Sequence, residues 1–162
     1  DEIVSFYKIK KFKSDKSKII YKGFVGDVEI FLFKSITYMN LTGIPLKSFV
    51  NYYKINLNKI IVIHDDLDLK FGRIKYKKGG RNGGHKGLEN IDNNLGSEYA
   101  RIRVGIGHPG NKNLVDKYVL TNFTTTEEFR LKKITNSICK NIFSLLKNDK
   151  NKFLSKISQK VI

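Results

Sequence analysis

Two short segments hold the residues of this chain whose types and spacing could do chemistry together. Residues 60–68 run Ile-Ile-Val-Ile-His-Asp-Asp-Leu-Asp, so three carboxylates closely follow four β-branched residues. Residues 79–87 form the glycine-dense run Gly-Gly-Arg-Asn-Gly-Gly-His-Lys-Gly. The β-branched residues predict a strand buried on both faces, and ligands of open α/β sheets bind beyond the carboxyl ends of such strands. Because glycine lets backbone approach a bulky ligand, we expect both segments to border one site.

Asp65 is one carboxylate of this group that could take part in acid–base chemistry. At the end of a buried strand it can accept the ring N–H of a histidine and keep the other ring nitrogen basic, so that the histidine activates water. The alternative is that Asp65 only caps a turn with Asp66 and Asp68. The residues by themselves leave both interpretations open.

Neither glycine motif predicts an enzyme that binds a nucleotide cofactor. The run 79–87 lacks the Gly-Lys-Ser/Thr ending that holds phosphates and magnesium in a phosphate loop. Residues 105–110 match the dinucleotide pattern, but Pro109 removes an amide and the next acidic pair, 127–128, falls at a helix start. We interpret both runs as close-approach backbone around a groove.

The charge of the chain favours a polyanionic ligand. Its 31 Lys and Arg against 15 Asp and Glu give a net charge of +16 over 162 residues. Such an excess attracts nucleic acid, although an AT-rich coding sequence would also enrich lysine. The single Cys139 excludes an intrachain disulfide and is expected in a helical core. With no membrane-length apolar run and no signal peptide, we expect a cytoplasmic protein.

Strand and helix patterns alternate, which predicts a single α/β domain over residues 1–162. Thr124 and Glu127 form a capping-box signature before the longest helix, and Gly96 ends a shorter one. The expected strands are 18–25, 28–33, 60–64, 73–78 and 101–107. The expected helices are an N-terminal one through residues 3–7, one following Thr42, 88–95, one or two turns in 113–119, one beginning after Thr124, and the docked tail 148–162.

Four motifs together resemble the bacterial peptidyl-tRNA hydrolase family. They are Thr-Tyr-Met-Asn-Leu-Thr-Gly at 37–43, His-Asp-Asp-Leu-Asp at 64–68, Gly-Gly-His-Lys-Gly-Leu at 83–88, and Arg-Ile-Arg-Val-Gly-Ile-Gly-His-Pro-Gly at 101–110. They follow the family's order at close to its spacing. The resemblance implies a twisted mixed sheet flanked by helices, a monomer, and hydrolysis of the ester between peptide and tRNA without metal or organic cofactor.

The resemblance also implies roles for particular residues. Asp65 would orient and stabilise a catalytic histidine, and Asn40 would anchor substrate and water. Tyr38 would line the groove near the terminal nucleotide or the peptide. The basic positions that would contact the acceptor end and phosphate backbone of tRNA are Lys75, Lys77, Lys86 and Arg103.

Two departures from the family pattern bear on activity. In the family, a strand and a loop with the water-activating histidine precede the first helix, whereas this sequence opens on Asp1 inside a helical pattern. We therefore expect residues to be missing before Asp1, and this 162-residue chain by itself to be inactive on peptidyl-tRNA. Lys86 stands where the family has asparagine. The alternative function is a non-catalytic tRNA- or RNA-binding relative that has lost the general base.

None of the three histidines present is expected to replace that base. His64 and Asp65 are neighbours on a strand, so their side chains point to opposite faces, and His64 is expected in the core or behind the site. His85 is expected to orient the glycine loop, and His108, before Pro109, to cap a strand end.

Overall fold

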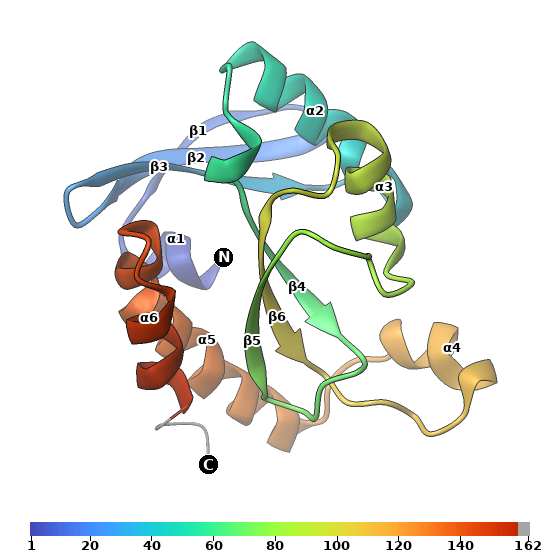
Figure 1. The fold of residues 1–162 in the computed structure, drawn as a ribbon. Coiled ribbons are helices and arrows are strands. Elements are labelled where there is room, and N and C mark those ends of the chain that lie inside the picture. Colours follow the sequence, from blue (N-terminus) through green and yellow to red (C-terminus); the bar gives the residue numbers. More distant parts are fainter. Residues whose placement is uncertain (159–162) are drawn as a thin grey trace. The chain divides into compact units, whose positions relative to one another are not determined.

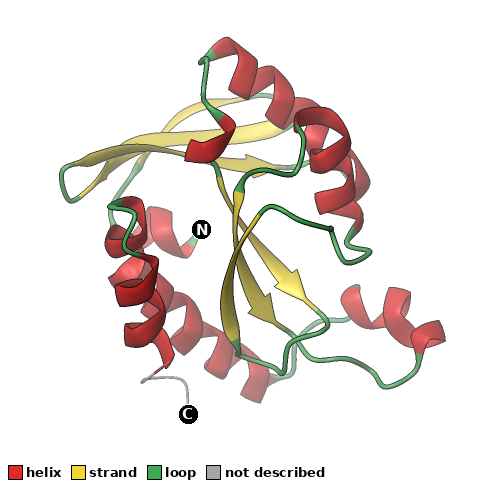
Figure 2. Cartoon of the chain, viewed as in Figure 1, coloured by secondary structure: helices red, strands yellow, loops and turns green. Residues whose placement is uncertain are grey.

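The computed structural model describes residues 1–158 (Figure 1). The chain divides into two compact units. Unit 1 contains residues 1–62 and 77–101, and unit 2 contains residues 63–76 and the chain from Ile102 onward. Helices and strands alternate, so the predicted α/β class is confirmed (Figure 2). That the whole chain forms one domain stays a prediction.

Unit 1 contains a three-stranded antiparallel sheet in the order β1-β2-β3. The predicted hairpin is confirmed: β2 (Lys18–Val25) and β3 (Val28–Ser35) are joined at Gly26, whose φ of 62° suits a tight turn. The sequence patterns did not predict β1 (Lys10–Ser14). All of its residues are exposed, so it carries no apolar alternation that would mark a strand.

Two helices cover the core of unit 1. Helix α2 (Gly43–Tyr52) contributes Leu46 and Phe49, and α3 (Lys86–Leu95) contributes Leu88 and Ile91. A Cβ on Gly43 would overlap the backbone of Asn90, so only glycine permits the close approach of the two helices. The short 3₁₀ turn η1 (Met39–Leu41) precedes α2 and is thereby held against α3. The unit also contains α1 (Glu2–Phe6), where the sequence predicted a helix, and η2 (Leu57–Lys59).

The second sheet has the order β4-β6-β5. Its strands are β4 (Ile61–Asp66), β6 (Ala100–Gly105) and β5 (Ile74–Lys78). Amides of residues 100 and 106 bond to carbonyls of 60 and 66, which is a parallel pairing of β6 with β4. Amides of 79 and 105 bond to carbonyls of 99 and 73, so β6 runs antiparallel to β5. The predicted mixed sheet is confirmed.

Two predictions about these strands were wrong. β4 is not buried on both faces, since Ile63 is 42% exposed, because β4 lies at an edge of the described sheet. It also extends to Asp66, so Asp65 belongs to the strand and does not follow it. β6 is the central strand and is buried along almost its whole length.

Unit 2 is built around the predicted long helix. In α5 (Thr125–Leu146) the Thr124–Glu127 capping box is present and Cys139 is buried, both as predicted. The docked tail is confirmed as α6 (Lys150–Ser158), which buries Phe153 against the unit, whereas residues 159–162 lie outside the described chain. The predicted turns in 113–119 are η3 (Lys112–Leu114) and α4 (Val115–Val119).

Candidate functional site

The candidate residues of unit 1 lie at and before the first turn of α3. The Nδ1 atom of His85 accepts hydrogen bonds from Gly87 N at 3.1 Å and Leu88 N at 3.2 Å, which makes His85 the cap of the helix. An accepting Nδ1 carries no proton, so a neutral His85 ring holds its proton on Nε2. The expectation that His85 orients backbone is therefore confirmed.

Three residues predicted to bind substrate come together at this helix start. Tyr38 and Asn40 flank Met39 at η1. The Met39 thioether packs closely on Gly87, since a Cβ added to Gly87 would lie 2.5 Å from the Met39 Sδ atom. Tyr38 is 82% exposed, and Asn40 and Lys86 are also exposed. The arrangement presents an aromatic face, an amide and a cation to solvent beside the glycine loop, a combination that suits a terminal nucleotide and its ribose.

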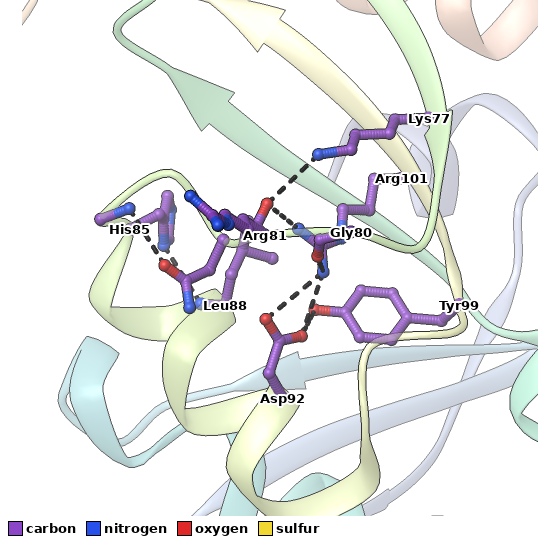
Figure 3. A network of polar contacts seen from close by, with 10 residues as sticks. Lys77, Gly80, Arg81, His85, Leu88, Asp92, Tyr99 and Arg101 are labelled. Atoms are coloured by element: carbon purple, nitrogen blue, oxygen red, sulfur yellow. Dashed lines mark hydrogen bonds and ion pairs between the residues drawn. The ribbon is translucent and has the colours of Figure 1, made fainter.

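The glycine loop is held from inside by Arg101 (Figure 3). Its Nη2 donates to the Gly80 carbonyl at 3.0 Å and to Asp92 at 3.1 Å, and its Nη1 donates to the Arg81 carbonyl at 3.1 Å. The guanidinium lies over the ring of Tyr99, 4.7 Å from its centre. Lys77 Nζ also donates to the Arg81 carbonyl, at 3.3 Å.

Sequence reasoning missed this network. Arg101 is 1% exposed although it follows the same alternation as Arg103, and nothing in that alternation separates a buried arginine from a solvated one. Burial raises the pKa of the Tyr99 hydroxyl, and the hydrogen bond that it donates to Asp92 at 2.7 Å raises it further. The sequence does contain Asp92 in a predicted helix and Tyr99 two residues before Arg101. Nothing in the sequence indicates that these three side chains meet, because the fold brings them together.

The candidate residues of unit 2 begin at the end of β4. Asp65 lies there partly buried, as a carboxylate that orients a base would. His64 Nδ1 lies 2.6 Å from the Asp65 carbonyl, and because a carbonyl only accepts, Nδ1 is the donor. His64 is partly buried and tied to the backbone, in agreement with a supporting role.

Asp66 is a structural carboxylate. One of its oxygens accepts from the amide of Asp68 at 3.0 Å, and the other accepts from Arg103 Nε at 2.6 Å. This hydrogen bond raises the pKa of Arg103. Of the three clustered acids, the turn-capping alternative therefore applies to Asp66, and the predicted tRNA-binding Arg103 has an acidic partner.

The two lysines predicted to bind phosphates differ in their surroundings. Lys75 is exposed on β5, whereas Lys77 is half-buried and its ammonium group donates a hydrogen bond to the Arg81 carbonyl of the glycine loop. In the histidine-bearing loop after β6, His108 Nδ1 accepts from Gly110 N at 3.0 Å, which confirms its predicted structural role.

Two further observations concern residues 1–158. They include no cluster of three or more His, Cys, Asp or Glu side chains placed to ligate a metal ion. In the same part of the chain, none of the helices has both the length and the apolar character needed to cross a membrane.

Comparisons with known proteins agree on one family. The family model for peptidyl-tRNA hydrolase matches residues 1–162. A peptidyl-tRNA hydrolase of Bartonella quintana is 41% identical over 150 residues, covering 93% of this chain and 76% of that protein. One from Wolbachia pipientis is 38% identical over 157 residues, covering 97% and 85%. The crystal structure of the Acinetobacter baumannii peptidyl-tRNA hydrolase superposes with a TM-score of 0.86 at 30% identity, covering 96% of this chain and 80% of that one. The chain therefore belongs to the peptidyl-tRNA hydrolase family.

Proposed function

We propose that η1 and the first turn of α3 bind the acceptor end of peptidyl-tRNA, and that Asp65 orients the base that activates water. Hydrolysis of the ester between peptide and tRNA is the reaction of the family to which the chain belongs. The observation that carries the proposal is the convergence of exposed Tyr38, Asn40 and Lys86 at one helix start.

The reaction sets clear demands on these groups. A water attacks the ester carbonyl, a base takes its proton, and the ribose 3′ oxygen leaves with a proton as the free hydroxyl. A histidine serves as the base when a carboxylate holds the proton on its far nitrogen, which is the role we give Asp65. His85 does not fit as that base, because its Nδ1 accepts two helix amides.

Asn40 and Lys86 are assigned to substrate binding. An amide at Asn40 can both donate to the ester or ribose oxygens and accept from the attacking water. Lys86 supplies a positive charge where the family has a neutral amide, and a cation there favours binding to the phosphates of the acceptor end. Tyr38, being almost fully exposed, can stack on the terminal base or line the peptide path.

The tRNA backbone is assigned to Lys75, Lys77 and Arg103. Contacts to phosphates give affinity without reading sequence, which suits an enzyme that must act on many tRNAs. Since Asp66 already pairs with Arg103 and the loop carbonyl with Lys77, Lys75 is the lysine of this set with the most exposed charge. We further propose that the protein acts in the cytoplasm. We also propose that it is a monomer, which size-exclusion chromatography with light scattering tests.

The decisive experiment is Asp65→Asn in the active enzyme, meaning a form of the protein that includes the catalytic histidine of the family. An asparagine keeps the shape but cannot stabilise an imidazolium, so kcat should fall by about 10²–10⁴-fold while the thermal unfolding midpoint stays the same. Asp68→Asn, which removes an exposed carboxylate three residues away, is the matched control and should retain turnover. Equal turnover in wild type and Asp65→Asn would reduce Asp65 to a strand-end residue. The non-catalytic alternative gains no support from the comparisons, since the relatives are named as hydrolases.

A further inference from the structure

The glycine loop has little conformational preference of its own. Gly79, Gly80, Gly83 and Gly84 all have positive φ values, between 64° and 82°. Such residues lose the most conformational freedom on folding, so contacts that restrain the loop from outside add to its order beside its internal hydrogen bonds at Asn82. The loop leads directly into His85 and Lys86, which makes its order a condition for a fixed substrate-binding surface.

Arg101 supplies contacts that fall on two consecutive peptide groups of this loop. Its terminal nitrogens donate to the carbonyls of Gly80 and Arg81, and one of them also donates to Asp92. Two anchors on neighbouring peptide groups restrict rotation of the loop entry, which a single bond would not do. A planar guanidinium can do this, whereas the point charge of a lysine cannot reach both carbonyls and the acid together.

The surroundings of Arg101 keep its guanidinium aimed at the loop. The arginine is 1% exposed, it stacks on Tyr99, and Tyr99 donates to the same Asp92 that pairs with Arg101. Its Nε atom is buried with no hydrogen-bond partner among the described residues. A buried donor without a partner is unfavourable. The guanidinium is therefore oriented by its hydrogen bonds to the loop carbonyls and Asp92, although this orientation leaves the Nε–H group unpaired within residues 1–158.

We propose that Arg101 is a positioning residue for substrate binding: held by Asp92 and Tyr99, it keeps the glycine loop in the conformation that presents Lys86 to the acceptor end of tRNA. This inference rests on the proposed binding role of the α3 start. Without Arg101, the loop samples other conformations and only a fraction is competent to bind. The apparent dissociation constant then rises as the inverse of that fraction, and a competent fraction of about one tenth weakens binding about tenfold.

The test compares Arg101→Lys with wild type in three measurements. Affinity for deacylated tRNA should fall about five- to tenfold. In the active enzyme KM should rise while kcat stays within about twofold, because bound substrate restores the same loop conformation. Limited trypsin cleavage after Arg81 should accelerate, and saturating tRNA should suppress the extra cleavage.

Controls separate positioning from general destabilisation. Ile142→Val shortens a side chain in the core of α5 and should lower the unfolding midpoint without changing tRNA affinity or cleavage after Arg81. If Arg101→Lys fails to fold, Asp92→Asn replaces it, with smaller changes in the same direction. Normal tRNA affinity in a folded variant, or a lower kcat at unchanged KM, would overturn the inference. Absence of tRNA binding by the wild-type chain would instead overturn the proposed function.

Discussion

At the residue scale, the histidines and acids divide by the atoms they already use. The Nδ1 atom of His85 accepts hydrogen bonds from two helix amides, and the Nδ1 atom of His108 accepts one from a turn amide, so both histidines are structural. Asp66 is engaged at both oxygens by Asp68 and Arg103. Of the acids in the 64–68 motif, Asp65 is our candidate for orienting a base, because it lies partly buried at the end of β4 and the family resemblance assigns it that role.

Lys86 gives the sharpest prediction for a single side chain. Lys86→Asn restores the amide of the family pattern, so we expect kcat to rise while affinity for tRNA falls slightly, because one cation is lost near the phosphates. Steady-state kinetics on peptidyl-tRNA and tRNA titrations measure the two effects. Lys86→Met removes the same charge without adding an amide and should weaken binding without raising kcat. If both variants behave alike, the amide has no special role.

At the scale of elements, the start of α5 shows how a local motif can act without distant partners. Glu127 accepts from Thr124 N at 2.9 Å and from its hydroxyl at 2.7 Å, and Glu127 N donates back to that hydroxyl. The hydrogen bond from the Thr124 backbone, and then that from its side chain, lowers the pKa of Glu127 from its ordinary value. Four sequence positions are sufficient to specify this cap, which is why the sequence predicted it.

The lowered pKa predicts a pH-dependent contribution to stability. Because the folded pKa lies below the unfolded one, the contribution is complete above the unfolded pKa and is lost as pH falls through the folded pKa. Denaturant unfolding of wild type and Glu127→Gln should therefore differ more at pH 6 than at pH 3. Glu128→Gln, in the same first turn, is the control and should show no such narrowing. If the difference in unfolding free energy between wild type and Glu127→Gln does not change with pH, the ionised Glu127 carboxylate does not stabilise the cap.

Thr124→Ala tests the same element from the other side of the cap. It removes the hydroxyl that accepts from Glu127 N and should lower the free energy of unfolding by about 1 kcal/mol at neutral pH. Urea unfolding followed by circular dichroism measures the change. No loss of stability would mean that the cap is dispensable because packing of α5 on α6 holds the helix.

At the scale of the whole molecule, the net charge of +16 must be explained either by a polyanionic substrate or by codon composition. Family membership makes tRNA the expected polyanion. The two explanations differ in how the charge acts. Phosphate contacts release condensed counterions, so they make affinity fall steeply with salt, whereas a compositional excess need not be coupled to any particular residue.

The double variant Lys75→Ala/Lys77→Ala distinguishes these explanations. We expect weaker binding to all tRNAs alike, and a slope of log affinity against log salt that is smaller by up to about two, because each phosphate contact contributes about 0.9. Lys140→Ala/Lys150→Ala removes two exposed lysines from α5 and α6 and is the charge-matched control. Equal slopes in the two double variants would favour compositional drift.

The sequence by itself determined the features that depend on neighbouring residues or on several motifs read together. The hairpin at Gly26, the capped α5 and the end of α3 at Gly96 follow from turn and cap chemistry within a few positions. The family followed from four motifs in order, and the comparisons confirm it. These properties are local or linear, so no fold is needed to recognise them.

Only the tertiary structure decided which polar residues act inside the molecule. Arg101 and Arg103 alternate identically along the chain, yet the first is buried against a loop, Asp92 and Tyr99, while the second pairs with Asp66. The exposure of β4 and the burial of β6 depend on their order in the sheet, and the closeness of Met39 to Gly87 depends on the contact between η1 and α3. Burial and hydrogen-bond partners are set by residues distant in the chain, and no periodicity encodes them.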